Sequence, residues 1–249
     1  MENKIVVANM KMNLEIKDIS SYLKKIEEIE DENFIVCPSN IYIPYFLKKK
    51  YKVGSQNCHF EKGGAFTGEV SPKQLKSLGV EYVIIGHSER RNIFKEDDIL
   101  IKKKVVSALE ENLKVIFCIG ETLEEREMGR TLQVIKRQML NVLPNLQKNI
   151  IVAYEPVWSI GTGKIPTNEE IEEVISYIKK VLRELELESK VLYGGSVSRE
   201  NISELQKTEN VDGFLIGGAS IDAEHIIDIL NIIKTLRWSV YFFSKYTLI

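Results

Sequence analysis

Eight short apolar runs recur along the chain, and each is separated from the next by a longer segment that suits a helix. The runs are β-branched or apolar at nearly every position, which is typical of parallel strands that are buried on both faces. The expected strands are residues 5–8, 34–37, 53–56, 82–86, 115–119, 150–154, 191–193 and 213–216.

The segments between these runs carry the amphipathic period of surface helices and the signals with which helices begin. The clearest amphipathic segments are residues 19–29, 99–109, 131–143 and 171–185. Ser71 followed by Pro72 predicts an N-cap with proline at the first helical position. Capping boxes are expected at two pairs, Thr122 with Glu125 and Thr167 with Glu170.

Eight strand–helix units of about 30 residues each favour an α/β protein with a single (β/α)8 barrel, because units of this kind close into such a barrel. A doubly wound open sheet is the alternative that the count leaves open. The barrel is expected to form one catalytic domain over residues 1–234. Residues 235–249 are aromatic, have no acidic residue and lack a clean helical period, so we expect a weakly ordered extension or a loose patch on the barrel's exterior, of unknown role.

Composition excludes several classes of function. The formal net charge of −2 provides no basic field for nucleic acid. Three cysteines without regular spacing argue against disulfides and a zinc site, and they suit a reducing cytoplasm. No apolar run reaches the length of a membrane span. The N-terminus leads directly into the first expected strand, so we expect no signal peptide.

Active sites of such barrels lie at the carboxyl ends of the strands, and three of the polar positions there suit chemistry. Lys11, just after Asn9, places a cation over the barrel mouth, although an isolated lysine is more often a surface residue. His87 begins a helical turn, whose positive end is expected to lower the pKa of the ring and keep it neutral. Glu155 ends an apolar strand, where a carboxylate is costly unless it is used or paired.

Small residues after the later strands suit an anion. Gly161 lies in a small-residue segment whose backbone N–H groups could reach one, although a plain connecting loop is the simpler interpretation. Ser196 and the pair Gly217–Gly218 follow the seventh and eighth runs, where barrels commonly bind phosphate. Together with the cation, the neutral donor and the carboxylate, this pattern favours abstraction of a proton next to a carbonyl of a phosphorylated substrate.

The chain resembles the triosephosphate isomerase family in seven segments, which follow one another in the family's order over residues 4–234. They are NMKMN (9–13), GHSERR (86–91), CIGET (118–122), YEPVW (154–158), IGTGK (160–164), YGGSV (193–197) and GGAS (217–220). The resemblance implies a glycolytic enzyme that interconverts dihydroxyacetone phosphate and glyceraldehyde 3-phosphate through an enediol(ate), with no cofactor and no metal.

The resemblance also implies a role for each residue. Glu155 would be the base, His87 would polarise the carbonyl, and Lys11 and Asn9 would bind the substrate. Phosphate would lie on the residues after the later strands, which are Gly161, Ser196, Gly217 and Gly218. Residues 156–166 would form a lid. The family is itself a known example of a glutamate base that works beside a histidine kept neutral, so these two roles come from the resemblance as well as from the residues.

The family works as a homodimer, so the resemblance implies that Thr67 approaches Asn9 and Lys11 of a second copy. Ala8 and Met10 depart from the glycine and tryptophan that are usual in the family. Two other functions remain open. A Schiff-base aldolase would need a lysine in the barrel wall, and a barrel that kept the fold as a binding or scaffold protein would have lost catalysis.

Overall fold

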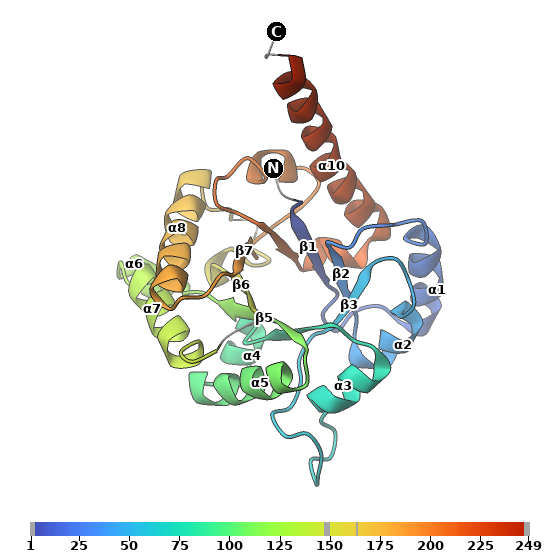
Figure 1. The fold of residues 1–249 in the computed structure, drawn as a ribbon, viewed down its shortest axis with the longest axis vertical. Helices are drawn as coiled ribbons and strands as arrows, with labels where there is room; N and C mark the ends of the chain where they lie inside the picture. Colours follow the sequence, from blue (N-terminus) through green and yellow to red (C-terminus); the bar gives the residue numbers. More distant parts are fainter. Residues whose placement is uncertain (1–2, 147–149, 163, 247–249) are drawn as a thin grey trace.

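The computed structural model describes residues 3–146, 150–162 and 164–246, and its strands form a closed parallel barrel in chain order. Figure 1 shows the strands at the centre and the helices arranged around them. The closed barrel excludes the open-sheet alternative. The strands are β1 (Ile5–Asn9), β2 (Phe34–Cys37), β3 (Lys52–Ser55), β4 (Tyr82–Ile85), β5 (Lys114–Ile119), β6 (Ile150–Tyr154), β7 (Lys190–Tyr193) and β8 (Gly213–Ile216).

Each predicted strand is present to within one residue at either end, and the predicted helix starts are confirmed. Ser71 caps a helix that begins at Pro72, and both predicted capping boxes form. The helices are α1 (Ile16–Lys25), α2 (Ile43–Phe46), α3 (Pro72–Leu78), α4 (Ser88–Asn92), α5 (Asp98–Glu110), α6 (Leu123–Glu127), α7 (Thr131–Val142), α8 (Asn168–Glu184), α9 (Ile202–Leu205) and α10 (Ala223–Tyr246), with short 3-10 turns η1 (Asn40–Tyr42), η2 (Val157–Ser159) and η3 (Gly218–Ile221).

Helix α1 differs most from its predicted range, since it begins and ends earlier than residues 19–29. It begins early because the Glu15 side chain and Asp18 form a capping box there. Such a box satisfies backbone N–H groups that the first helical turn would otherwise leave unpaired.

Side chains along the strands alternate between two apolar layers. Val7 belongs to a cluster made only of strand residues, inside the barrel, whereas Val6 and Ala8 pack against the surrounding helices. The interior row of β6 holds Ile151 and Ala153. Continuing the alternation by one step in each strand places polar residues at the barrel mouth, which are Asn9 in β1 and Glu155 after β6.

The C-terminal segment differs from the expectation of a weakly ordered extension. Helix α10 continues without a break from Ala223 to Tyr246, and Figure 1 shows its last turns projecting beyond the barrel. No glycine or proline occurs between these two residues, and extending an existing helix avoids the cost of a new nucleus. Residues 247–249 lie outside the described residues.

The long loop between β3 and α3, residues 56–71, also projects from the barrel (Figure 1). Its aromatic rings pack on one another, with centroids of His59 and Phe66 4.4 Å apart and those of His59 and Phe60 also 4.4 Å apart. Thr67 near its tip is exposed in the single chain. Connections of this length inside a compact domain are usually functional, so this loop is a candidate for binding.

Candidate active site

Glu155 follows β6 and is only 2% exposed. Its backbone N–H donates to the Ile119 carbonyl at 2.7 Å, which continues the pairing of β6 with β5 past the last strand residue. One carboxylate oxygen, Oε2, accepts the backbone N–H of Ser88 at 2.9 Å. The other, Oε1, lies 3.0 Å from Nε2 of His87. The buried carboxylate is therefore paired on both oxygens.

His87 is the N-cap of α4 and is 6% exposed. Its Nδ1 accepts the backbone N–H of Glu89 at 3.2 Å. A nitrogen that accepts a hydrogen bond carries no proton, so the proton of the neutral ring is on Nε2. The Nε2–H group faces the barrel mouth, where it meets the carboxylate of Glu155.

The pKa of His87 differs from the expectation. Burial lowers it, but the negative charge and the hydrogen bond of Glu155, helped by Glu89, together raise the pKa of His87 above its ordinary value of 6.5. The expectation of a lowered pKa was wrong for this arrangement, because it considered the helix end and burial and not the contact with Glu155.

Lys11 extends over the barrel mouth and forms an ion pair with Glu89, with 2.7 Å between Nζ and Oε1. Its backbone adopts φ 52°, a left-handed conformation that is uncommon for a side chain of this size. Asn9 holds this turn, since its Oδ1 accepts the Lys11 backbone N–H at 3.0 Å. Strained residues of this kind cluster at functional sites, which supports Lys11 as a site residue.

Two side chains that the sequence reasoning missed support the same turn. The Lys11 carbonyl accepts from the Ser39 hydroxyl at 3.0 Å and from the Gln56 amide at 2.8 Å. Both follow the end of a strand, β2 and β3 respectively, and that position is the signal that could have identified them. Glu89 stood in a recognised motif, but no local pattern indicated that it pairs with Lys11.

The expected phosphate-binding residues lie at the same end of the barrel. A Cβ placed on Gly217 would lie 3.0 Å from Cε of Lys11, so the loop after β8 passes directly beside the lysine. Gly218 begins the 3-10 turn η3. Ser196 donates its hydroxyl to the Ser159 carbonyl at 2.6 Å, which joins the loop after β7 to the segment after β6. Gly161 lies in that segment, and residue 163 is outside the described residues.

A second carboxylate, Glu121, anchors the start of the expected lid and was also missed. It is fully buried, and it accepts the indole N–H of Trp158 at 2.9 Å and the hydroxyl of Tyr154 at 3.2 Å. Burial raises the pKa of Glu121, while the bonds from Trp158 and Tyr154 oppose that rise. Its position two residues past β5, next to the other strand ends, was the available signal.

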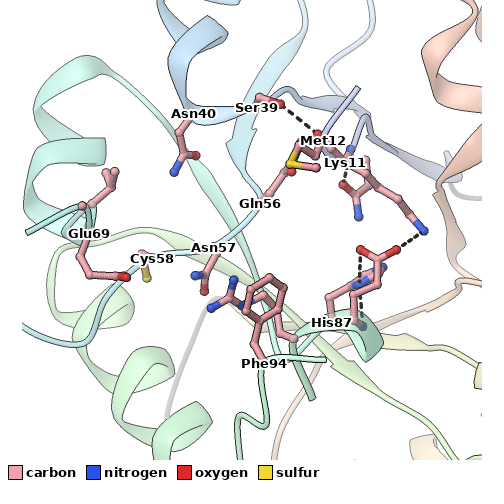
Figure 2. A pocket seen from close by; sticks show the side chains of 15 residues that line it. Lys11, Met12, Ser39, Asn40, Gln56, Asn57, Cys58, Glu69, His87 and Phe94 are labelled. Carbon is pink, nitrogen blue, oxygen red and sulfur yellow. Dashed lines mark hydrogen bonds and ion pairs between the residues drawn. The ribbon is translucent and has the colours of Figure 1, made fainter. Parts of the chain in front are cut away.

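A hollow of about 370 Å³ opens beside the site, and Figure 2 shows Lys11 and His87 on one side of it and Asn40, Cys58 and Glu69 on the other. Glu155 is not among its lining residues. Met12 at its edge is 94% exposed, and Phe94 is 60% exposed. This hollow therefore extends the site toward an outer surface that carries these two exposed apolar side chains. Thr67 is not among the residues that line this hollow in one chain, although its neighbour Gly68 is.

The positions of the strand lysines bear on the aldolase alternative. Lysines within the strands, which are Lys52, Lys114 and Lys190, are the first residues of β3, β5 and β7, at the end of the barrel opposite to the site. They do not supply the interior lysine that an aldolase needs. The two departures from the usual family pattern, Ala8 and Met10, are both buried in the layer against the helices.

Metal ligands and membrane-spanning helices are absent from the part of the chain that the structure describes. Within residues 3–146, 150–162 and 164–246, no group of histidine, cysteine, aspartate and glutamate residues could hold a metal ion. Among the same residues, none of the helices combines the length and the apolar character that crossing a membrane requires.

The chain is similar in sequence to known proteins over nearly its whole length. The family model described as triosephosphate isomerase matches residues 4–233. The triosephosphate isomerase of Alkaliphilus oremlandii is 42% identical over 247 residues, which cover 93% of this chain and 100% of the relative. That of Aquifex aeolicus is 42% identical over 242 residues, covering 91% of this chain and 98% of the relative. The chain therefore belongs to the triosephosphate isomerase family of aldose–ketose isomerases.

Proposed function

We propose that Glu155 is the base that moves a proton between the two carbons of a triose phosphate, interconverting dihydroxyacetone phosphate and glyceraldehyde 3-phosphate. The observation that carries this proposal is the placement of the buried Glu155 carboxylate 3.0 Å from the Nε2 of His87 at the barrel mouth. A base and a hydrogen-bond donor that close together can act on adjacent atoms of one small substrate.

His87 is the electrophile in this proposal. Because its Nδ1 is occupied by the Glu89 backbone N–H, the ring presents Nε2–H to the mouth. That group donates to the substrate carbonyl oxygen and stabilises the negative charge that develops as the enediolate forms. Asn9 supplies a further polar group, and Lys11 a positive charge, near the same substrate oxygen.

Glu155 must move before it can act. The contact of 3.0 Å between Glu155 and His87 leaves no room for a substrate oxygen between the two side chains. A bound substrate therefore displaces the carboxylate from His87 and from the Ser88 N–H, and turns it toward the carbon that loses the proton. The same displacement removes the negative charge that raises the pKa of His87, and this favours the neutral ring during the reaction.

The phosphate group belongs beside Lys11, on the loops that carry Gly161, Ser196, Gly217 and Gly218. The closeness of Gly217 to Lys11 supports this assignment, because it brings the loop backbone and a cation together. Residues 156–166 form the lid, whose start is held by Glu121 through Trp158. Closure of the lid would exclude water and protect the intermediate from loss of phosphate.

The working unit in this proposal is a homodimer. Two exposed apolar side chains, Met12 and Phe94, lie at the hollow beside Lys11, and exposed apolar surface at a site favours a protein contact. The loop of residues 56–71 of a second copy has an aromatic end of suitable character, with Phe66 41% exposed. Its Thr67 would then approach Asn9 and Lys11 across the interface.

The cytoplasm is the proposed compartment. All three cysteines, Cys37, Cys58 and Cys118, are free and buried. Burial raises the pKa of Cys58 to about 12, which keeps that thiol protonated and unreactive. Free thiols suit a reducing compartment, where a glycolytic enzyme also meets its substrate.

A coupled isomerase assay in both directions tests the proposal. The purified protein should turn over both triose phosphates without added metal or cofactor, and Glu155→Gln and Lys11→Met should each lose most of this activity. The exposed substitutions Glu124→Gln and Lys73→Met are matched controls that should retain it. Binding of triose phosphate without turnover would support the inactive scaffold instead. A covalent adduct trapped by borohydride would support the aldolase.

A further inference from the structure

The residue after β5, Gly120, has backbone groups that face away from β6. In a parallel pair, successive residues of a strand bond to opposite neighbours. The carbonyls on either side of Gly120 are used toward β6, since Ile119 accepts the N–H of Glu155 at 2.7 Å and Glu121 accepts the N–H of Val157 at 3.1 Å. The N–H and C=O of Gly120 therefore point to the side where β4 would lie.

Strand β4 does not continue far enough to bond to Gly120. It ends at Ile85, and Gly86 turns the chain away with φ 76° so that His87 reaches the barrel mouth. The placement of His87 thus leaves the backbone groups of Gly120 without a strand partner. A buried backbone N–H and C=O that stay unpaired cost free energy comparable to a lost hydrogen bond each.

The side chain of Gln138 replaces the missing strand. Its Oε1 accepts the Gly120 N–H at 2.9 Å, and its Nε2 donates to the Gly120 carbonyl at 3.1 Å. Gln138 is 5% exposed and stands in the buried row of α7, whose other buried members are apolar, namely Val134, Ile135, Met139 and Val142. A buried amide is unfavourable unless it is hydrogen-bonded, and here both of its polar groups bond to one residue.

Gly120 in turn packs directly on the backbone of Glu155. A Cβ added to Gly120 would lie 1.7 Å from the Glu155 carbonyl oxygen and 2.6 Å from its carbonyl carbon. No side chain fits at this position, so the two backbones are in contact. Any shift of Gly120 toward or away from β6 is therefore transmitted to the backbone that carries the Glu155 carboxylate.

We propose that Gln138 is a positioning residue for Glu155, acting through Gly120. The inference rests on the role of Glu155 proposed above. The amide of Gln138 fixes Gly120 at the break between β4 and β5, and Gly120 fixes the height of Glu155 in the barrel mouth. A misplacement of a catalytic group near 1 Å can cost on the order of 100-fold in rate, so a loosened Gly120 should lower kcat more than it raises KM.

The test replaces Gln138 with methionine, which has similar length and no amide. Gln138→Met should lower kcat by about 10–100-fold while KM changes by less than about threefold. Gln133→Met is the matched control, because Gln133 is exposed on the same helix, and it should leave both constants unchanged. Ile135→Val, a buried change on α7 that keeps the amide, controls for lost stability and should also retain kcat.

Two further measurements separate positioning from a general structural role. In the Glu155→Gln background, Gln138→Met should cause no further loss, because residues that act as a unit are not additive. Titration of His87 by nitrogen-15 NMR is a second readout, which does not depend on isomerase activity. If Gln138→Met lets Glu155 withdraw from the ring, the pKa of His87 should fall toward its value in Glu155→Gln.

The outcomes distinguish this inference from the proposed function. If the parent is active and Gln138→Met has the same kcat and the same His87 titration as the parent, the positioning role is overturned. An equal additional loss in the Glu155→Gln background would also overturn it. If the parent lacks isomerase activity but Gln138→Met still shifts the titration of His87, the positioning role is kept and the proposed function is overturned. If Gln138→Met fails to fold, Gln138→Glu, which keeps the acceptor and loses the donor, decides by the same criteria.

Discussion

Shortening the proposed base by one methylene is the sharpest test of the active site. Glu155→Asp keeps the charge and the chemical type of the carboxylate, and it removes only one carbon–carbon bond of about 1.5 Å from the side chain. In the parent the carboxylate oxygens lie 2.9 Å from the Ser88 nitrogen and 3.0 Å from the His87 Nε2. Both contacts should be lost, because distances of roughly 4.4 Å lie outside hydrogen-bonding range.

The same withdrawal should act on the reaction. A carboxylate displaced by more than 1 Å from the carbon it deprotonates should lose on the order of 100-fold in kcat, which corresponds to about 2.7 kcal/mol of activation free energy. The KM for either triose phosphate should change little, because the proposed phosphate-binding residues, around Lys11 and Gly217, are untouched. The loss should therefore lie in kcat and not in substrate binding.

The assay is the coupled measurement of kcat and KM in both directions, with thermal unfolding measured on the same preparations. Glu124→Asp provides the matched control, since Glu124 is exposed on α6. A Glu155→Asp enzyme that keeps kcat within a few-fold of the parent would refute the assignment of Glu155 as the base. A parallel loss in Glu124→Asp would show that the assay reports on something other than the site.

Three further predictions test other parts of the structure. The pKa of His87 lies above its ordinary value, so the contribution of His87 to stability is full below about pH 6.5 and is lost as the pH rises through the folded-state pKa. In Glu155→Gln burial dominates, and nitrogen-15 NMR should find a lower pKa for His87. An unchanged titration would contradict the contact between Glu155 and His87. Shortening residues 63–68 should yield a monomer with badly impaired catalysis by sedimentation and assay, and a parent that is fully active as a monomer would contradict the dimer. Truncation after Lys234 should leave kcat and KM nearly unchanged, because every proposed site residue precedes Ser220; a folded but inactive truncated enzyme would assign the C-terminal segment a role in the reaction.

The fold was predictable because its signals are local. Each buried strand reads as a short apolar run, and each helix start at Ser71, Thr122 and Thr167 carries its own cap. The positions of Asn9, Lys11, His87 and Glu155 followed as soon as the strand ends were known, since parallel strands bring their carboxyl ends to one side of the barrel. Closure of the sheet was not predictable from the count of strands, and the structure decided it.

Contacts between loops and helices were not predictable in the same way. The bond of Gln56 to the Lys11 carbonyl and the pairing of Gln138 with Gly120 join residues far apart in the sequence, and no local pattern names the partner of either. For Gln138 the available signal was a glutamine at a helical position that periodicity assigns to the core, and for Gln56 it was the position after a strand end. The helical course of residues 235–246 was also missed, because periodicity reports on burial and an extended helix needs only the absence of breakers.

If Glu155 is the base, its contact with His87 explains how one site can be stable at rest and active with substrate. Without substrate, the buried carboxylate is satisfied by the Ser88 N–H and the His87 Nε2, which avoids the cost of an unpaired buried charge. In the proposed function substrate must break both contacts, so part of its binding free energy would be used to free the base and the donor. In the proposed function the phosphate group would supply this energy, because the loop of Gly217 that would bind it does not contact the reacting carbons. A truncated substrate without phosphate should therefore lose kcat as well as affinity, and an unchanged kcat for such a substrate would show that Glu155 is freed by some other means.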